Sequence, residues 1–291
     1  MKFLLSFFTF LFLFPFYSFA KEGKSKYDVY IWKGVESMKG ERVLMQVFVP
    51  ENANGTCAII CPGGSYHHLG VFTEGYTSAR WFNEQGATAC VLWYRVAKNN
   101  YHYPSQMQDI QRAIQIMRTD AKKYKVNPEK VGLVGYSAGG HLVAWAAEAG
   151  DEWNELEKIG IKSSVSLRPD FSVPVYPVVS MQDDIGHKWS RKSLLGKNPN
   201  QEEKDRFSLE LHASSAMPPI YLVACEDDPV VLFENSKRFS QALEEAKCDF
   251  VFASYPWGGH GFGMKNGAFM KTFKWNQGLK EFLCSHGFLS Y

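Results

Sequence analysis

The chain has 291 residues, of which 45% are hydrophobic and 15% aromatic, so it can bury a large core. Its formal net charge is +2, which gives no general electrostatic attraction to nucleic acid or to an acidic membrane surface. We therefore expect neither of them as a partner. Because no internal repeat and no low-complexity linker interrupts the sequence, we expect a single folded domain over residues 21–291.

The first twenty residues have the composition of a targeting segment. Lys2 supplies a positive charge, residues 3–16 are almost entirely apolar, and Ser18 and Ala20 are small residues at the two positions that a signal peptidase reads. This pattern predicts a signal peptide over residues 1–20, export to the periplasm or beyond, and no stable membrane insertion after cleavage. An uncleaved membrane anchor is the alternative, because residues 3–20 approach the length that spans a bilayer.

After this segment, strand-like and helix-like patterns alternate. Residues 27–32 and 43–50 alternate in polarity and predict a hairpin at a sheet edge, and the later strands are near-continuous apolar runs, typical of a parallel sheet covered on both faces. The alternation predicts a doubly wound α/β sandwich with a mostly parallel sheet of about eight strands. The expected inner strands are 56–61, 88–94, 131–135, 171–176, 220–224 and 250–255, and the expected helices are 74–85, 104–124, 138–148, 230–246 and 267–284.

Residues 181–215 break this rhythm. Their sequence is rich in charged residues and is interrupted by glycine and proline, and it predicts a small helical insertion. Two interpretations remain open: a cap that brings His187 or Trp189 to a substrate, and a solvated excursion of the surface.

The most informative motif is Gly-Tyr-Ser-Ala-Gly at residues 135–139. An apolar strand at 131–134 leads into it and an alanine-rich helix follows, and in that setting a sharp turn lifts the hydroxyl of Ser137 clear of the sheet edge. The two glycines allow the strand and helix backbones to approach closely. The motif therefore predicts a nucleophilic serine.

A serine hydroxyl needs a base, and a glycine-rich loop after the strand at 250–255 offers His260. The acid that orients such a histidine comes before it in chain order, which leaves Asp227 or Asp228 after the strand at 220–224. We favour Asp228 because it directly precedes Pro-Val-Val, as the acid does in the related pattern D-P-x-V. We expect Asp227 and Glu226 to cap the helix that begins near residue 229.

A second glycine turn, Pro-Gly-Gly-Ser-Tyr at residues 62–66, follows the strand at 56–61. It occupies the position of the loop whose amides bind a developing oxyanion. We expect the amides of Gly64, Ser65 and Ala138 to serve as the donors. We expect His141, which directly follows the nucleophile turn, to be structural.

Several short motifs together carry a family resemblance over roughly residues 43–283. They are Pro-Gly-Gly-Ser-Tyr at 62–66, Glu-Gly at 74–75, Arg-Trp-Phe-Asn at 80–83, Val-Leu-Trp-Tyr-Arg at 91–95, Gly-Tyr-Ser-Ala-Gly-Gly-His at 135–141, Asp-Asp-Pro-Val-Val at 227–231 and Gly-Gly-His-Gly-Phe at 258–262. With these motifs the sequence resembles the α/β-hydrolase superfamily, in particular the bacterial carbohydrate-esterase branch called acetyl xylan esterase-like. Departures from the branch are Ser65 in place of a glycine, and Trp189 and Trp257 where relatives usually have other residues.

The resemblance implies a secreted serine esterase that hydrolyses acetyl or other short acyl esters, on carbohydrates such as xylan, through Ser137, His260 and Asp228. It implies no metal and no cofactor. Aromatic and imidazole side chains suit contact with a sugar, which makes Tyr66, His67, His68 and Trp257 candidate substrate contacts. Three alternatives share the motifs: a feruloyl or aryl esterase, a serine peptidase of the oligopeptidase branch, and an inactive carbohydrate-binding homologue.

Overall fold

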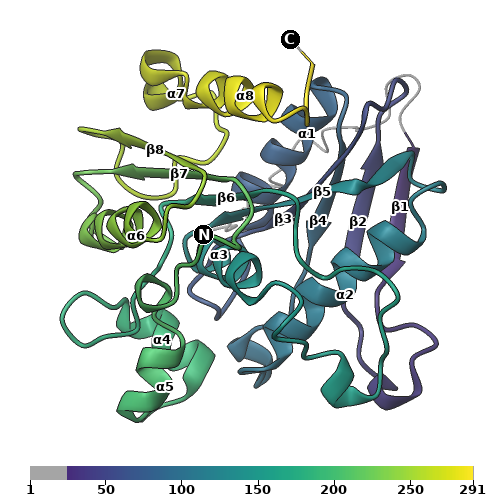
Figure 1. Ribbon diagram of the computed structural model, residues 1–291, viewed down its shortest axis with the longest axis horizontal. Coiled ribbons are helices and arrows are strands. Elements are labelled where there is room, and N and C mark those ends of the chain that lie inside the picture. Colours follow the sequence, from purple (N-terminus) through teal and green to yellow (C-terminus); the bar gives the residue numbers. More distant parts are fainter. Residues whose placement is uncertain (1–24, 291) are drawn as a thin grey trace, which may run out of the picture.

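The computed structural model describes residues 25–290, so the expected signal peptide lies outside the described residues. Within them one sheet carries the fold, with the strand order β1-β2-β4-β3-β5-β6-β7-β8 (Figure 1). The first two strands pair antiparallel with their neighbours, and every later pairing in the sheet is parallel. The strands are β1 (Ser25–Tyr30), β2 (Leu44–Val49), β3 (Gly55–Cys61), β4 (Thr88–Leu92), β5 (Val126–Tyr136), β6 (Ser172–Val175), β7 (Ile220–Cys225) and β8 (Phe250–Tyr255).

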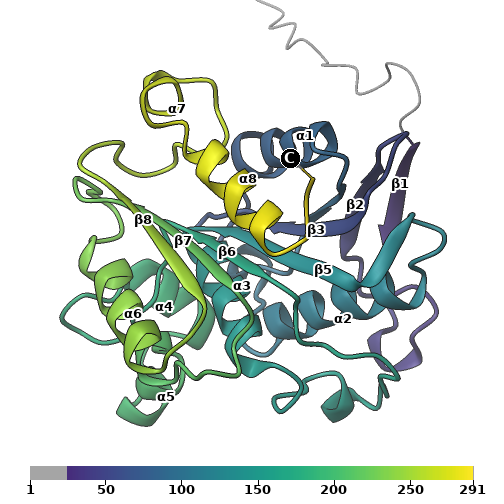
Figure 2. The ribbon, with the colours of Figure 1, turned by 45° about the horizontal axis from the view of Figure 1, so that its top comes forward.

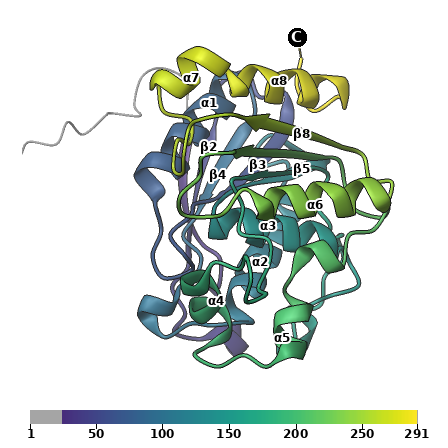
Figure 3. The same cartoon turned by 90° about the vertical axis from the view of Figure 1, so that its left-hand side faces the viewer.

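Helices cover both faces of this sheet. On one face lie α2 (Ser105–Thr119), α3 (Ala138–Ala149) and α6 (Glu234–Glu245); on the other lie α1 (Tyr76–Glu84), α7 (Ala268–Phe273) and α8 (Trp275–Ser285) (Figures 1 and 3). Successive strand residues point to opposite faces, so Ile59 belongs to the apolar cluster under α2 and α3, and Ile60 to the cluster under α1 and α8. Both faces are therefore covered by apolar side chains, which explains the uninterrupted apolar strands in the sequence.

Three of the expected helices differ from the structure. The helix expected over residues 104–124 ends at Thr119. The pattern at residues 267–284 is divided at Lys274, whose φ of 47° is left-handed, so α7 and α8 are separate helices. The helix expected from residue 230 begins at Glu234, because the residues after Asp228 form a turn around its carboxylate.

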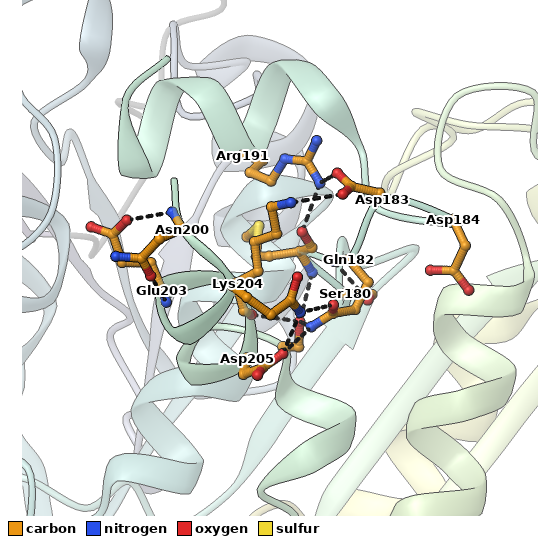
Figure 4. A network of polar contacts seen from close by, with 12 residues as sticks. Ser180, Gln182, Asp183, Asp184, Arg191, Asn200, Glu203, Lys204 and Asp205 are labelled. Carbon is orange, nitrogen blue, oxygen red and sulfur yellow. Dashed lines mark hydrogen bonds and ion pairs between the residues drawn. The ribbon is translucent and has the colours of Figure 1, made fainter. Parts of the chain in front are cut away.

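The segment expected to be a helical insertion does form short helices. It contains α4 (Lys188–Leu195) and α5 (Gln201–Arg206), which lie outside the sheet and its helix layers, on the side of α2, α3 and α6 (Figures 2 and 3). A polar network holds it: Asp183 pairs with Arg191 at 2.8 Å and with Lys204 at 2.7 Å (Figure 4). Its apolar residues Met181, Leu194, Phe207 and Leu209 are buried in the cluster under α2 and α3, so both the ion pairs and the main core hold the insertion.

Between residues 25 and 290, no helix combines the length and hydropathy that crossing a bilayer requires.

Candidate active site

Ser137 occupies a strained turn between β5 and α3. Its backbone has φ 54° and ψ −118°, which a residue with a Cβ rarely adopts. Backbone hydrogen bonds hold this conformation: the Ser137 amide donates to the carbonyl of Val175 at 3.0 Å, and its own carbonyl accepts from the amides of Val178 and His141, both at 3.1 Å. The turn therefore presents the serine at the carboxyl edge of the sheet, as the motif predicts.

The glycines on either side of Ser137 are sterically required. A Cβ on Gly135 would lie 2.1 Å from the carbonyl oxygen of Gly139, and a Cβ on Gly139 would lie 2.1 Å from the carbonyl oxygen of Cys61. Neither backbone can retreat without moving β3 or β5. The predicted close approach of strand and helix is confirmed.

His260 and Asp228 meet at the same edge of the sheet. The Nδ1 atom of His260 lies 2.7 Å from Oδ2 of Asp228, and the Asp228 side chain is buried. The other oxygen of Asp228 accepts hydrogen bonds from the amides of Val230 and Val231, at 2.8 and 2.9 Å. An acceptor facing Nδ1 assigns the proton of a neutral imidazole to that atom, which leaves Nε2 able to take a proton.

Asp227 has a different role from its neighbour. Its Oδ1 atom accepts a hydrogen bond from the amide of Gly259 at 2.7 Å. The expectation that it caps a helix is wrong, because the chain after Asp228 turns before α6 begins. Asp227 fastens the histidine loop to the end of β7.

The glycine turn after β3 packs directly on the nucleophile turn. A Cβ on Gly63 would lie 2.9 Å from the Cβ of Ser137. Gly64 and Ser65 have φ values of 129° and 57°, and the Gly64 carbonyl closes the turn by accepting from the amides of His67 and His68. Within residues 25–290 neither the Gly64 nor the Ser65 amide donates to an acceptor. These two amides are thus unpaired within the described residues, in a turn whose Gly63 lies against Ser137.

One expected substrate contact is wrong. Tyr66 is fully buried, and its hydroxyl lies 2.8 Å from Nδ1 of His141. The left-handed backbone at Ser65 and Tyr66 turns this ring into the core, where it also packs edge-on against Tyr94. His141 is also fully buried, with Nε2 2.9 Å from the carbonyl oxygen of Phe207, in agreement with a structural role. Burial lowers the pKa of His141 to about 4.

The other two residues of that turn face the insertion. The ring of Trp189, on α4, lies 5.3 Å from the ring of His67 and 5.9 Å from that of His68. Trp189 is 48% exposed, so part of its ring faces solvent. The three rings form a cluster, here called the aromatic platform, that joins α4 to the glycine turn.

The beginning of α4 also lies near the histidine–aspartate pair. The Nδ1 atom of His187 caps the helix by accepting from the amide of Ser190 at 3.4 Å, and it also lies 2.8 Å from Oγ of Ser190. Burial lowers the pKa of His187, the nearby His260 lowers it further, and Asp228 opposes both effects. The beginning of α4 therefore lies close enough to His260 and Asp228 for their charges to influence His187.

Trp257, the remaining candidate contact, is 40% exposed. Its ring packs on the rings of Phe269 and Phe273 in α7, at 6.1 and 5.1 Å. The structure thus joins it to the histidine loop and to α7, on the side of the sheet away from α4.

Two residues of the site have no assigned role in the sequence analysis. Glu74 is buried, and its Oε2 accepts from the amide of Gly63 at 2.7 Å while its Oε1 accepts from the hydroxyl of Tyr176 at 2.9 Å. The ring of Tyr176 lies 4.6 Å from the ring of His260. A signal for each existed: the Glu-Gly motif, and the position of Tyr176 at the carboxyl end of an inner strand.

Comparisons with known proteins agree with this arrangement. The model of the BD-FAE family matches residues 45–243, more than half of the chain. The chain is 33% identical over 223 residues to an acetylxylan esterase of Xylanibacter ruminicola, covering 75% of this chain and 43% of that protein. It is also 33% identical over 215 residues to endo-1,4-beta-xylanase B of Butyrivibrio fibrisolvens, covering 73% and 33%. The chain thus spans less than half the length of these curated relatives.

Among solved structures, the acetyl ester-xyloside bifunctional hydrolase of Caldicellulosiruptor lactoaceticus superposes with a TM-score of 0.80 at 29% identity, over 91% of this chain and 97% of that one. These likenesses confirm the expected fold and the resemblance drawn from the motifs.

Proposed function

Because the chain belongs to the BD-FAE family, we propose that it is a serine esterase that hydrolyses acetyl or other short acyl esters of carbohydrates such as xylan. The observation that carries this proposal is the 2.7 Å contact between His260 and Asp228, at the sheet edge where the strained turn presents Ser137. The names of the relatives, an acetylxylan esterase and an acetyl ester-xyloside hydrolase, support the substrate class.

The proposed reaction has two halves. The Oγ atom of Ser137 attacks the ester carbonyl while Nε2 of His260 takes its proton, and the same proton then passes to the departing sugar oxygen as the ester bond breaks. Asp228 holds the ring and stabilises its cation. Water next attacks the acyl-serine with His260 again as base, releasing the carboxylic acid and the free serine.

The amides of Gly64, Ser65 and Ala138 are the proposed oxyanion donors. Each tetrahedral intermediate places a negative charge on the former carbonyl oxygen, and preorganised amides stabilise it at little reorganisation cost. Two findings support this role: the Gly64 and Ser65 amides have no acceptor within the described chain, and the loop packs on Ser137 through Gly63. The Ala138 amide opens α3, where first-turn amides lack a helical partner.

The aromatic platform of His67, His68 and Trp189 supports a carbohydrate as the alcohol part of the ester. Aromatic rings offer an apolar face to the C–H face of a sugar, while imidazole nitrogens can bond its hydroxyls. Such rings would also stack on an aromatic acyl group, so a feruloyl or aryl esterase is the second candidate. Acetate release from acetylated xylo-oligosaccharides, measured beside ferulate release from feruloylated ones, separates the two: preferential ferulate release would overturn the acetyl assignment.

We also propose that residues 1–20 direct export and are removed after Ala20. The intact mass of the protein recovered outside the cytoplasm tests this directly. A mature chain that begins at Lys21 is expected, and a full-length chain held in the membrane fraction would favour the uncleaved anchor.

A further inference from the structure

A single buried carboxylate joins the two loops that carry the proposed machinery. One oxygen of Glu74 accepts from the amide of Gly63 in the glycine turn, at 2.7 Å. The other accepts from the hydroxyl of Tyr176, at 2.9 Å. Glu74 takes part in no step of the proposed reaction. Burying a carboxylate without partners costs free energy, so its two hydrogen bonds call for an explanation.

The chain around Glu74 is built to hold it. It belongs to a π-helical turn, Val71–Gly75, a conformation that is rare and often found at functional sites. A Cβ on Gly70 would lie 3.1 Å from Oε2 of Glu74, and the Gly70 amide donates to the carbonyl of Gly63 at 2.9 Å. The carbonyl of Glu74 itself accepts from the hydroxyl of Ser78, whose oxygen lies 2.5 Å from that of Tyr136. The glycine turn is thus folded over this side chain.

Tyr176 extends the connection to the histidine loop. Its hydroxyl donates to Glu74 and accepts from the amide of Gly263, at 3.2 Å. Its ring packs on the rings of His260 and Phe262, each at 4.6 Å. Its φ of 37° places it in the left-handed region, a strained conformation that surrounding contacts must maintain.

Both oxygens of Glu74 accept from donors, an arrangement that suits a carboxylate. Burial raises the pKa of Glu74, while the bonds from Gly63 and Tyr176 and the nearby charges of His260 and Lys265 oppose that rise. The titratable groups that face it are Tyr94, Tyr136, Tyr176, His260 and Lys265.

We propose that Glu74 is a positioning residue of the esterase site. It fixes the oxyanion loop through Gly63 and the histidine loop through Tyr176, so that the oxyanion donors and the base stay aligned. The inference rests on the proposed function. Donors and base must be aligned on one tetrahedral intermediate, and a displacement of about 1 Å between them can cost roughly 100-fold in rate. A carboxylate that bonds both loops keeps their separation constant through both halves of the reaction.

The test compares Glu74→Gln and Tyr176→Phe with the matched control Glu245→Gln, at an exposed glutamate on α6. With p-nitrophenyl acetate, we expect kcat to fall by about 10- to 100-fold in both test variants, with little change in KM. We expect the control to keep wild-type values. The losses in the double variant should be less than the product of the single losses, because both variants break the same connection.

The split between kcat and KM separates positioning from simple damage to the fold. A displaced oxyanion loop or imidazole lowers kcat at a nearly unchanged KM, whereas a damaged site loses substrate binding as well. Thermal unfolding shows whether each variant is folded, and if Glu74→Gln does not fold, Tyr176→Phe decides alone.

A folded Glu74→Gln protein with the kcat of the wild type would overturn the positioning role, as would a folded Tyr176→Phe protein with unchanged kcat. Multiplicative losses in the double variant would also contradict it. Failure of the proposed function looks different: the wild-type protein itself would not hydrolyse the ester, or Ser137→Ala would hydrolyse it as fast.

Discussion

Asp228 holds His260 through one carboxylate oxygen, Oδ2 at 2.7 Å from Nδ1, and holds its own turn through the other. The second oxygen accepts hydrogen bonds from the amides of Val230 and Val231, so the backbone fixes the aspartate side chain independently of the histidine. The orientation of the imidazole is therefore set by the turn after β7. Neighbouring Asp227 bonds the backbone of the histidine loop and not its ring.

The different contacts of Asp228 and Asp227 predict losses of very different size for two adjacent substitutions. Asp228→Asn should reduce kcat by roughly 10^4-fold, because an amide facing Nδ1 favours the wrong tautomer. Asp227→Asn keeps an oxygen that can accept from Gly259 and should reduce kcat only slightly. Steady-state kinetics with p-nitrophenyl acetate compare the two variants, and the reverse ranking would move the acid by one residue.

The buried His141 predicts an acid-sensitive fold. Its folded pKa of about 4 lies below the 6.5 of a free histidine, so the unfolded chain binds more protons between these values. The stabilising effect of keeping it neutral is complete above pH 6.5 and is lost as the pH falls toward 4, up to roughly 3 kcal/mol. Urea unfolding of the wild type and His141→Gln at pH 7.5 and pH 4.5 measures this. Equal losses of stability in both proteins would show that His141 is not responsible.

The character of the insertion predicts short-acyl selectivity. A buried methylene contributes about 0.8 kcal/mol only when an apolar channel receives it. The insertion carries many charged side chains, among them the ion pairs of Asp183 with Arg191 and Lys204 (Figure 4), so we expect it to offer no such channel to a long acyl chain. We expect kcat/KM to be highest for p-nitrophenyl acetate, lower for the butyrate and lowest for the octanoate. If the octanoate were the best substrate, a lipase-like function would replace the one proposed here.

The aromatic platform predicts a substitution that affects the sugar and spares the ester chemistry. Trp189→Ala should raise KM for acetylated xylo-oligosaccharides up to about tenfold, as expected for the loss of one ring contact, and leave p-nitrophenyl acetate nearly unchanged. Tyr30→Ala is the matched control, because that ring is similarly exposed but lies on β1, at the opposite edge of the sheet from β8. Equal effects of the two substitutions on the oligosaccharide would argue against the platform as a subsite.

Sequence patterns were sufficient to predict the sheet and the turn at Ser137, because both depend on local sequence. The sheet follows from apolar runs, and the turn follows from glycines where two backbones nearly touch. They were insufficient for Tyr66. Its position after the glycine turn predicts contact with substrate, but the left-handed backbone at residues 65 and 66 directs the ring into the core. The division of the last helix at Lys274 is likewise a backbone event that leaves no mark in hydrophobic periodicity.

The connection between Glu74 and Tyr176 shows the main limit of sequence reasoning. The two residues are 102 positions apart, and their contact arises only when β6 takes its place in the sheet. A glutamate at the start of a helical pattern looks like a solvent-exposed charge near a helix N-terminus. Only the packing of the glycine turn over it reveals a buried carboxylate that links two loops.

Ser137 tests the central claim most directly. Acetate release from acetylated xylo-oligosaccharides should be compared between the wild type and Ser137→Ala, with thermal unfolding to show that the variant is folded. Removing the nucleophile of a serine triad lowers kcat by about 10^6-fold, and we predict a loss of that order with an unchanged unfolding transition. A folded Ser137→Ala protein that releases acetate at the wild-type rate would contradict the serine esterase mechanism.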